Sequence, residues 1–162
     1  MKAFRIALQR HGATAKVAFS GLSGCSADGR WHSKGRALDY AAESQSLAVL
    51  ERLVHYKRFD ALEPHVLFLI EIPDSLIHTC GEPPKGWDGS ALLPAAQAVG
   101  NRWCDERQSP ALKVPSAVTR GEFNLMLNSK HPAWDWGWIA RRQPFALDGR
   151  LRELLQSTGK KR

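Results

Sequence analysis

Apolar and polar positions alternate along this chain in patterns that predict two helices among several short strands. The clearest helix is predicted over Ser44–Tyr56, where apolar residues recur at the spacing of one helical face: Leu47, Leu50, Leu53 and Val54. The run Val66–Ile72 is almost wholly apolar and contains β-branched side chains, which is typical of a strand buried on both faces. These two segments are the strongest predictions of regular structure.

The remaining elements are shorter. Strands are predicted at Phe4–Leu8, Ala37–Ala41, Leu112–Val118 and Trp134–Ile139, a second helix at Ala95–Arg107, and a last helical turn at Leu151–Leu155. Pro115 indicates that its strand lies at a sheet edge or contains a bulge. Gly12–Gly35 and Cys80–Gly89 are rich in glycine or proline and predict loops, and long loops in a compact domain are often functional. Mixed short elements without regular βαβ spacing predict an α+β fold.

Length and charge refine this picture. The 162 residues fit one domain, expected over 1–155, followed by a flexible basic tail at 156–162. The net charge is +7, but Gly149–Arg162 contains five basic residues and one acidic residue, so most of the excess lies near the C-terminus. No apolar run is long enough to cross a bilayer, and the N-terminus carries no export signal. We therefore expect a cytoplasmic protein that contacts polyanions, if at all, through its tail.

The cysteines suggest no chemistry. Cys25, Cys80 and Cys104 are odd in number and form no CxxC pair, so neither a disulfide framework nor a metal site is expected. We expect them to be small buried side chains in a reducing compartment.

Glu51 is the first candidate for a functional site. At about 100° per residue it lies at the margin of the apolar stripe of the predicted helix, and His55 follows one turn later. A carboxylate at that margin needs a partner, because burying an unpaired charge is costly. Two interpretations remain open: a Glu51–His55 pair at the surface, or a site carboxylate tuned by its surroundings.

Arg30, Trp31 and Tyr40 are candidates in and after the glycine-rich loop. An arginine there can fork onto phosphate oxygens, while glycines let the backbone approach a ligand closely. Alternatively, Arg30 stacks on Trp31. The Tyr40 ring can serve the core or stack on a flat cationic ligand.

Three tryptophans suggest a different class of function. Trp134, Trp136 and Trp138 would share one strand face, close to Lys130, Arg141 and Arg142, which imitates a platform for single-stranded nucleic acid. The alternative, that the rings belong to the core or to an interface, is favoured.

Taken in order, several motifs resemble one family, the RES domain. They are Gly29-Arg-Trp-His-Ser-Lys-Gly35, Tyr40, Leu47–His55, Val114-Pro-Ser116, Asn124–Pro132 and Phe145–Leu151. Each motif alone is weak, but together they cover about Phe4 to Leu151. Three positions depart from the family pattern: Asp28 stands where Gly is usual, His32 where Asn is usual, and Ser129 where Pro is usual.

The resemblance implies a bacterial toxin with a fold like that of the ADP-ribosyltransferases. RES proteins are toxins of RES–Xre modules and consume NAD, by phosphorolysis or hydrolysis or, in some members, by protein ADP-ribosylation. The family's catalytic Arg, Glu and Ser correspond to Arg30, Glu51 and Ser116, with Trp31, Tyr40 and His55 in the NAD pocket. NAD is then a substrate, with inorganic phosphate as a possible co-substrate, and no metal or resident cofactor is expected. The implied partners are an Xre-family antitoxin and a second copy of the chain, with nucleic acid contacted only through the antitoxin.

The chemistry of NAD fits this residue set. Nicotinamide leaves the ribose as a neutral ring, so the reaction needs no general acid, and one carboxylate suffices. We expect Arg30 to bind phosphate, Tyr40 to stack on nicotinamide, and Glu51 to stabilise the oxocarbenium-like ribose. Ser116 would orient the ribose or the attacking group, and His55 would tune Glu51. The sequence leaves open whether phosphate, water or a protein accepts the ADP-ribose.

Overall fold

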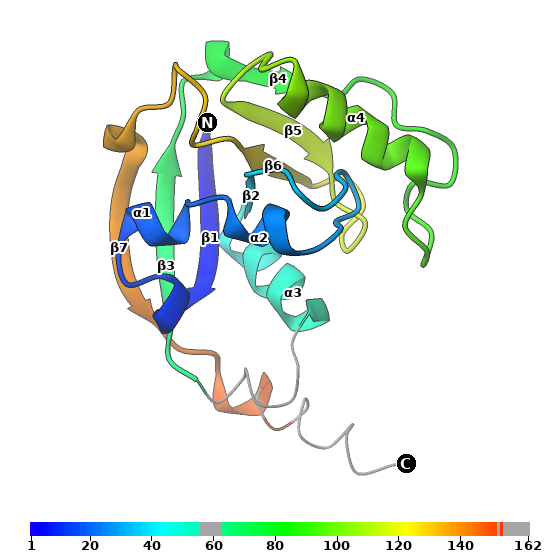
Figure 1. Cartoon of the computed structure of the whole chain (residues 1–162). Coiled ribbons are helices and arrows are strands. Elements are labelled where there is room, and N and C mark those ends of the chain that lie inside the picture. Colours follow the sequence, from blue (N-terminus) through cyan, green and yellow to red (C-terminus); the bar gives the residue numbers. More distant parts are fainter. Residues whose placement is uncertain (56–62, 152, 154–162) are drawn as a thin grey trace.

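A seven-stranded sheet organises the chain (Figure 1). The structure, a computed structural model, describes residues 1–55, 63–151 and 153. The strands are β1 (Lys2–Leu8), β2 (Asp39–Ala42), β3 (His65–Glu71), β4 (Ile77–Thr79), β5 (Ala111–Pro115), β6 (Phe123–Leu127) and β7 (Ile139–Phe145). Their order is β4-β5-β6-β2-β1-β3-β7, and every pair is antiparallel except β4 with β5. This mixed sheet with few helices confirms the α+β prediction.

Helices cover both faces of the sheet. They are α1 (Ala15–Ala18), α2 (Leu22–Ser26), α3 (Gln45–His55) and α4 (Pro94–Asp105), with single 3-10 turns at Gln9–His11, Asp74–Leu76 and Trp136–Trp138. Phe19, directly after α1, packs edge-on against Phe68 of β3 in the largest core cluster. On the other face, α3 buries Leu47 and Ala48 against β1 and β2, and α4 buries Trp103 against β5 and β6.

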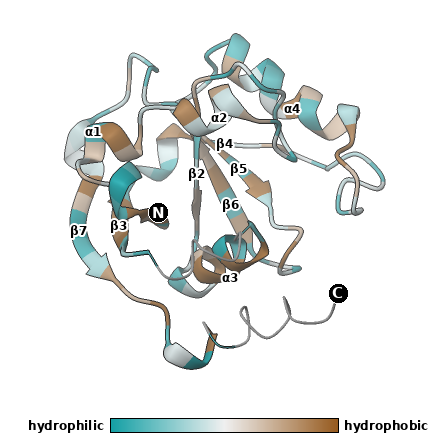
Figure 2. Ribbon diagram, turned by 60° about the horizontal axis from the view of Figure 1, so that its bottom comes forward, coloured by the Kyte–Doolittle hydropathy of each residue, from teal (hydrophilic) through white to brown (hydrophobic). Residues whose placement is uncertain are grey.

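Strand register places α3 and α4 over the same face. Tyr40 of β2 lies opposite Met126 of β6, which lies opposite Leu112 of β5, so these side chains point to one side. Met126 and Leu112 pack with Trp103 of α4. Two residues along, Ala42 lies opposite Asn124 on that same side. Figure 2 shows α3 and α4 at opposite sides of the view, with β5 and β6 between them.

The helix predicted over Ser44–Tyr56 is confirmed as α3, and Ser44 caps it by accepting the backbone N–H of Leu47 at 3.0 Å. Tyr56 lies outside the described residues. The predicted buried stripe is partly wrong, because Leu50 and Val54 are 39% and 64% exposed. The helix packs instead through Leu47 and Ala48, which turns Glu51, one turn further along, toward the sheet.

The strand predicted at Val66–Ile72 is confirmed as β3, which lies between β1 and β7 and is buried along most of its length. The strand predicted at Leu112–Val118 ends earlier, at Pro115. On the β4 side its pairing stops at Lys113, so Pro115 has a strand partner only in β6, as the edge prediction requires.

The strand predicted at Trp134–Ile139 is wrong. The side chain of Asp135 accepts the backbone N–H of Gly137 at 2.7 Å and caps a 3-10 turn, and β7 begins only at Ile139. Trp134 does not lie on a strand, and its ring packs against the rings of Phe19 and Trp138. The three tryptophans therefore share no strand face, which removes the basis for the nucleic-acid platform, the less favoured of the two interpretations.

Other segments refine the predictions. Gly12–Gly35 contains α1 and α2 rather than loop alone, and α2 starts from Gly21, whose φ of 78° favours glycine. Cys80–Gly89 is a loop, as expected. The three cysteines are free and only half-buried. The tail at 156–162 lies outside the described residues, as does most of Leu151–Leu155. Within the described part of the chain, no helix has the length and apolar character needed to cross a membrane.

Candidate functional site

Glu51 is held by two side chains from the sheet. One of its carboxylate oxygens, Oε1, accepts a hydrogen bond from Ser116 Oγ at 2.8 Å and another from Asn124 Nδ2 at 2.5 Å. Both donors reach the same oxygen, and in the described part of the chain no side chain bonds to Oε2. The carboxylate is thus fixed in orientation with one oxygen left to meet a ligand. The sequence prediction that Glu51 needs a partner is confirmed.

Ser116 uses its whole hydrogen-bonding capacity inside the protein. Its hydroxyl is buried, with 1% of the residue exposed, and donates its only proton to Glu51. The same oxygen accepts the backbone N–H groups of Val118 and Thr119, at 3.1 and 3.3 Å. A hydroxyl has one donor and two acceptor positions. Ser116 would have to release Glu51 before it could donate to a substrate.

Asn124 is a site residue that sequence reasoning did not single out. It lies on β6 opposite Ala42, on the face covered by α3, and donates to Glu51 across 73 positions of sequence. The signal was present in the pattern, because Asn124 is the one polar residue in the run Phe123–Leu127. A polar side chain on the covered face of such a strand needs a partner.

Arg30 is anchored to the loop that precedes α4. Its Nη1 donates to the backbone oxygens of Trp87 at 2.5 Å and Gly89 at 2.9 Å. Among the described residues, no acceptor bonds to Nε or Nη2, the pair of donors that presents a side-on fork. That fork matches two oxygens of a phosphate or carboxylate.

Tyr40 lies where the charges of Glu51 and Arg30 both act on it. Burial raises the pKa of Tyr40 far above its ordinary value; the backbone of Trp31 lowers it, the Glu51 carboxylate raises it, and the Arg30 guanidinium lowers it. The phenol therefore stays neutral at physiological pH. The charges of two predicted residues, Arg30 and Glu51, thus both influence a third, Tyr40.

A buried ion pair between Arg5 and Asp39 fixes the backbone at Tyr40. Arg5 donates to the backbone oxygen of Tyr40 at 2.7 Å and to Asp39 Oδ1 at 2.9 Å. Asp39 also accepts the N–H of Gly21 and the hydroxyl of Ser23, which ties α2 to β2. Asp39 thus accepts hydrogen bonds from three donors, and it fixes the strand that carries Tyr40.

Helix α4 braces the segment that carries Arg30. Gln97 donates to the backbone oxygens of Gly29 and His32, at 3.1 and 3.2 Å. One turn further, Asn101 exchanges hydrogen bonds with Ser33. Trp31 is buried and packs against Trp87, with ring centroids 5.2 Å apart. Trp31 therefore belongs to the wall that holds Arg30.

His55, the remaining predicted site residue, stands apart from this cluster. It is exposed at the end of α3 and has no hydrogen bond or ion pair to Glu51. The structure holds Glu51 through Ser116 and Asn124 instead. A tuning role for His55 stays a prediction.

The three departures from the family pattern are local. His32 is buried beneath Tyr40. Asp28 accepts the backbone N–H of Lys34 at 2.8 Å, and Ser129 donates to the backbone oxygen of Phe19 at 2.5 Å. Of the three, only His32 touches a residue of the site.

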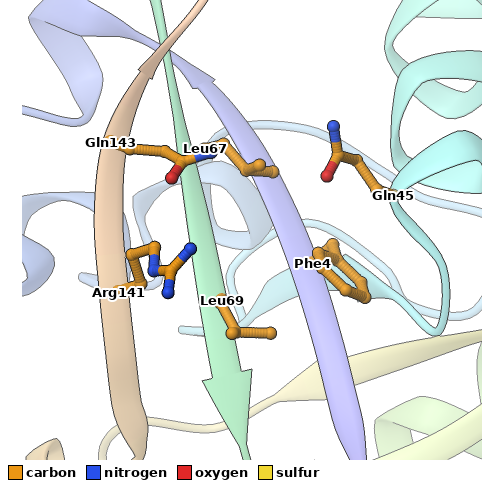
Figure 3. Close-up of a pocket in the computed structure, with 6 residues that line it drawn as sticks. All are labelled: Phe4, Gln45, Leu67, Leu69, Arg141 and Gln143. Atoms are coloured by element: carbon orange, nitrogen blue, oxygen red, sulfur yellow. The ribbon is translucent and has the colours of Figure 1, made fainter.

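A shallow cavity lies elsewhere on the sheet. Figure 3 shows its lining from β1, β3, β7 and the first turn of α3: Phe4, Gln45, Leu67, Leu69, Arg141 and Gln143. None of these is a predicted site residue. In the described residues, no group of three histidine, cysteine or acidic side chains is placed to hold a metal ion.

Comparison with known protein families identifies the family to which this chain belongs. The RES domain family matches residues 2–148, nearly the whole chain. The chain belongs to the RES domain family. The family resemblance that the sequence motifs suggested is confirmed.

Curated relatives of this RES protein are toxins by name. A "Toxin Res" from Yersinia enterocolitica is 35% identical over 156 residues, which cover 94% of this chain and 100% of that protein. The "Prs ADP-ribosylating toxin" of a Sphingobium species is 35% identical over 119 residues, covering 68% of this chain and 74% of that protein. These relatives match most of their own lengths.

A solved structure shares the fold. A chain of the M. tuberculosis MbcT–MbcA toxin–antitoxin complex aligns with a TM-score of 0.73, covering 96% of this RES chain and 88% of that chain. The two are 16% identical, so the likeness speaks for the fold alone.

Proposed function

We propose that this RES protein is the toxin of a toxin–antitoxin module and that it cleaves the nicotinamide–ribose bond of NAD. The observation that supports this most directly is the Glu51 carboxylate, fixed through Oε1 with Oε2 available, in one site with Arg30 and Tyr40. A fixed carboxylate facing a developing oxocarbenium ion stabilises the transition state without reorganising at the moment of reaction.

Each residue has a role in this proposal. Arg30 binds a phosphate oxygen pair of NAD through Nε and Nη2. The neutral Tyr40 ring stacks on the cationic nicotinamide. Glu51 stabilises the positive charge that develops on the ribose as neutral nicotinamide departs, so no acid is required for the leaving group.

Ser116 and Asn124 act as positioning residues in this scheme. Their two hydrogen bonds hold Glu51 in one rotamer, and the hydroxyl of Ser116 is already used. The bond broken is ribose C1′ to the nicotinamide nitrogen, and the bond formed joins C1′ to an oxygen of phosphate or water.

The test is to incubate the purified protein with NAD, with and without inorganic phosphate, and to separate the products. Phosphate-dependent nicotinamide release with a phosphorylated ADP-ribose would identify a phosphorylase, whereas release independent of phosphate would identify a hydrolase. Glu51→Gln keeps the shape and removes the charge, so we expect it to lose about 10²-fold or more in turnover. Intact NAD in every tube, from folded wild-type protein free of other chains, would refute the proposal.

Protein ADP-ribosylation is the second candidate, favoured by the name of the Sphingobium relative. The same site would then pass ADP-ribose to a side chain of another protein. Incubating a bacterial lysate with labelled NAD and this protein distinguishes the two, because a transferase labels a protein band and Glu51→Gln abolishes the label.

An antitoxin partner is proposed on the likeness to a chain of a toxin–antitoxin complex. Its assignment to the Xre family, and the homodimer, remain predictions. Light scattering on the purified chain tests the dimer directly.

A further inference from the structure

His32 is a buried polar side chain in contact with Tyr40 of the proposed NAD site. Only 3% of the residue is exposed, and its Nδ1 lies 2.8 Å from the hydroxyl oxygen of Tyr40. The two rings are tilted by 46° with centroids 5.5 Å apart. The imidazole thus contacts the hydroxyl end of the ring that the proposed function stacks on nicotinamide.

The surrounding backbone is shaped for this imidazole. Gly29 lies against it, and a Cβ at Gly29 would collide with the His32 ring and crowd the Tyr40 hydroxyl. Gly29 and His32 form an isolated backbone bridge, and Gln97 of α4 binds the backbone oxygens of both. The histidine ring therefore occupies a fitted space rather than a chance position.

The hydrogen bond between His32 and Tyr40 has a preferred direction. His32 Nε2 is buried and has no hydrogen-bond partner in the described part of the chain, although the backbone carbonyls of Ala27 and Gly24 favour a proton on the ring. Because Nδ1 is the ring nitrogen within hydrogen-bond distance of Tyr40, we assign the ring proton that these carbonyls favour to Nε2. With Nε2 protonated, neutral Nδ1 accepts the Tyr40 hydroxyl proton.

We infer that His32 is a positioning residue for NAD, which holds the Tyr40 ring as a hydrogen-bond acceptor while neutral and opposes the cationic nicotinamide once protonated. This inference rests on the proposed function of the site. While His32 is neutral, the Tyr40 proton points to Nδ1 of His32 and the ring face stays electron-rich. Protonated His32 would donate to the Tyr40 hydroxyl and bring a positive charge next to that ring, which weakens stacking with a second cation.

The groups around His32 determine the pH at which its imidazole becomes protonated. Burial lowers the pKa of His32 below the 6.5 usual for imidazole; the carbonyl of Ala27 and the Asp28 carboxylate raise it, and Arg36 lowers it. From β2 the facing group is Tyr40, which the charges of Glu51 and Arg30 also influence, and from α4 the uncharged Gln97 binds the backbone oxygen of His32. NAD affinity should therefore fall as the pH decreases below about 6.5.

The experiment follows NAD binding and the His32 ring separately. Calorimetric titrations with NAD between pH 4.5 and 8 use Glu51→Gln protein, which slows NAD consumption and removes the Glu51 carboxylate from the site. Repulsion between protonated His32 and the cationic nicotinamide predicts affinity about ten-fold weaker below the pKa of His32 than at pH 8. His32→Asn in the same background should lose this dependence, and His78→Asn, an exposed histidine on β4 outside the site, should keep it.

Nitrogen NMR of the imidazoles reads the ring directly. We expect His32 to carry its proton on Nε2 and to titrate below pH 6.5. An Nδ1–H tautomer, a ring that stays neutral down to pH 4.5, or equal NAD affinity above and below the observed pKa would overturn the inference alone. Absence of NAD binding at every pH would refute the proposed function, and with it this use of His32.

Discussion

Replacing Ser116 by Ala tests whether this hydroxyl serves the substrate or the carboxylate. The change removes the donor to Glu51 Oε1 and leaves Asn124 as the remaining support. A hydrogen bond to a charged group contributes about 1.5–3 kcal/mol. If all of that orients Glu51 for the transition state, the loss corresponds to about 10- to 150-fold in kcat.

The decisive measurement is a double-mutant cycle on NAD turnover. If Ser116 acts through the charge of Glu51, then Ser116→Ala should cost about three-fold or less when Glu51 is already Gln, because no charge remains to orient. Asn124→Ala should show the same dependence on Glu51. Equal losses from Ser116→Ala in both backgrounds would refute the reasoning, as would a rise in KM with kcat unchanged, which indicates direct substrate contact.

Stability must be followed alongside activity. Ser116 also accepts two backbone N–H groups, of Val118 and Thr119, so its removal should lower the free energy of unfolding by about 1–3 kcal/mol. Asn124 makes no hydrogen bond to those two groups, which makes Asn124→Ala the matched variant for the catalytic effect. Both are compared well below their melting temperatures.

Three further predictions concern the supports of the site. Gly100→Ala should destabilise the protein by about 1–3 kcal/mol in urea unfolding despite the better helix former, because the new Cβ collides with the backbone oxygen of Trp31; an unchanged midpoint would contradict the close packing of α4. Asp39→Ala leaves Arg5 as a buried charge without its carboxylate partner and should lower the free energy of unfolding by about 3–5 kcal/mol in the same assay. Asp74→Ala, which removes an exposed partner of the N-terminus, is the control and should have a small effect. Because the folded-state pKa of His32 is lowered, its contribution to stability is complete above pH 6.5 and is lost as the pH falls toward that pKa, with a slope of up to about 1.4 kcal/mol per pH unit that should be absent in His32→Asn.

The sequence predicted those elements whose apolar side chains follow the pattern of a buried helix or strand. α3 and β3 follow from runs of apolar side chains, and the need of Glu51 for a partner follows from its place beside such a run. β7 was not predicted, because it pairs only with β3 and carries Arg141, Arg142, Gln143 and Pro144, which an edge strand tolerates. The strand prediction at Trp134–Ile139 was wrong because the side chain of Asp135 caps the 3-10 turn that follows it.

The site was only partly predictable, for a related reason. Arg30, Glu51 and Ser116 were located by family motifs, but the partner of Glu51 depends on strand register, which no local pattern encodes. Asn124 stands out as the one polar residue of its strand, but its pairing with Glu51 is recognisable only when β6 is known to lie beside β2. In the same way, the sequence shows His32 only as a residue of a predicted loop, and the structure reveals its contact with the Tyr40 hydroxyl.

The contacts of Glu51 also bear on how the chain is synthesised. Its two supports, Ser116 and Asn124, lie 65 and 73 positions later in the sequence. Because translation delivers the N-terminal part first, α3 leaves the ribosome long before the strands that hold its carboxylate. The nascent polypeptide would remain without an assembled site until β6 has emerged, which delays activity to the last part of translation.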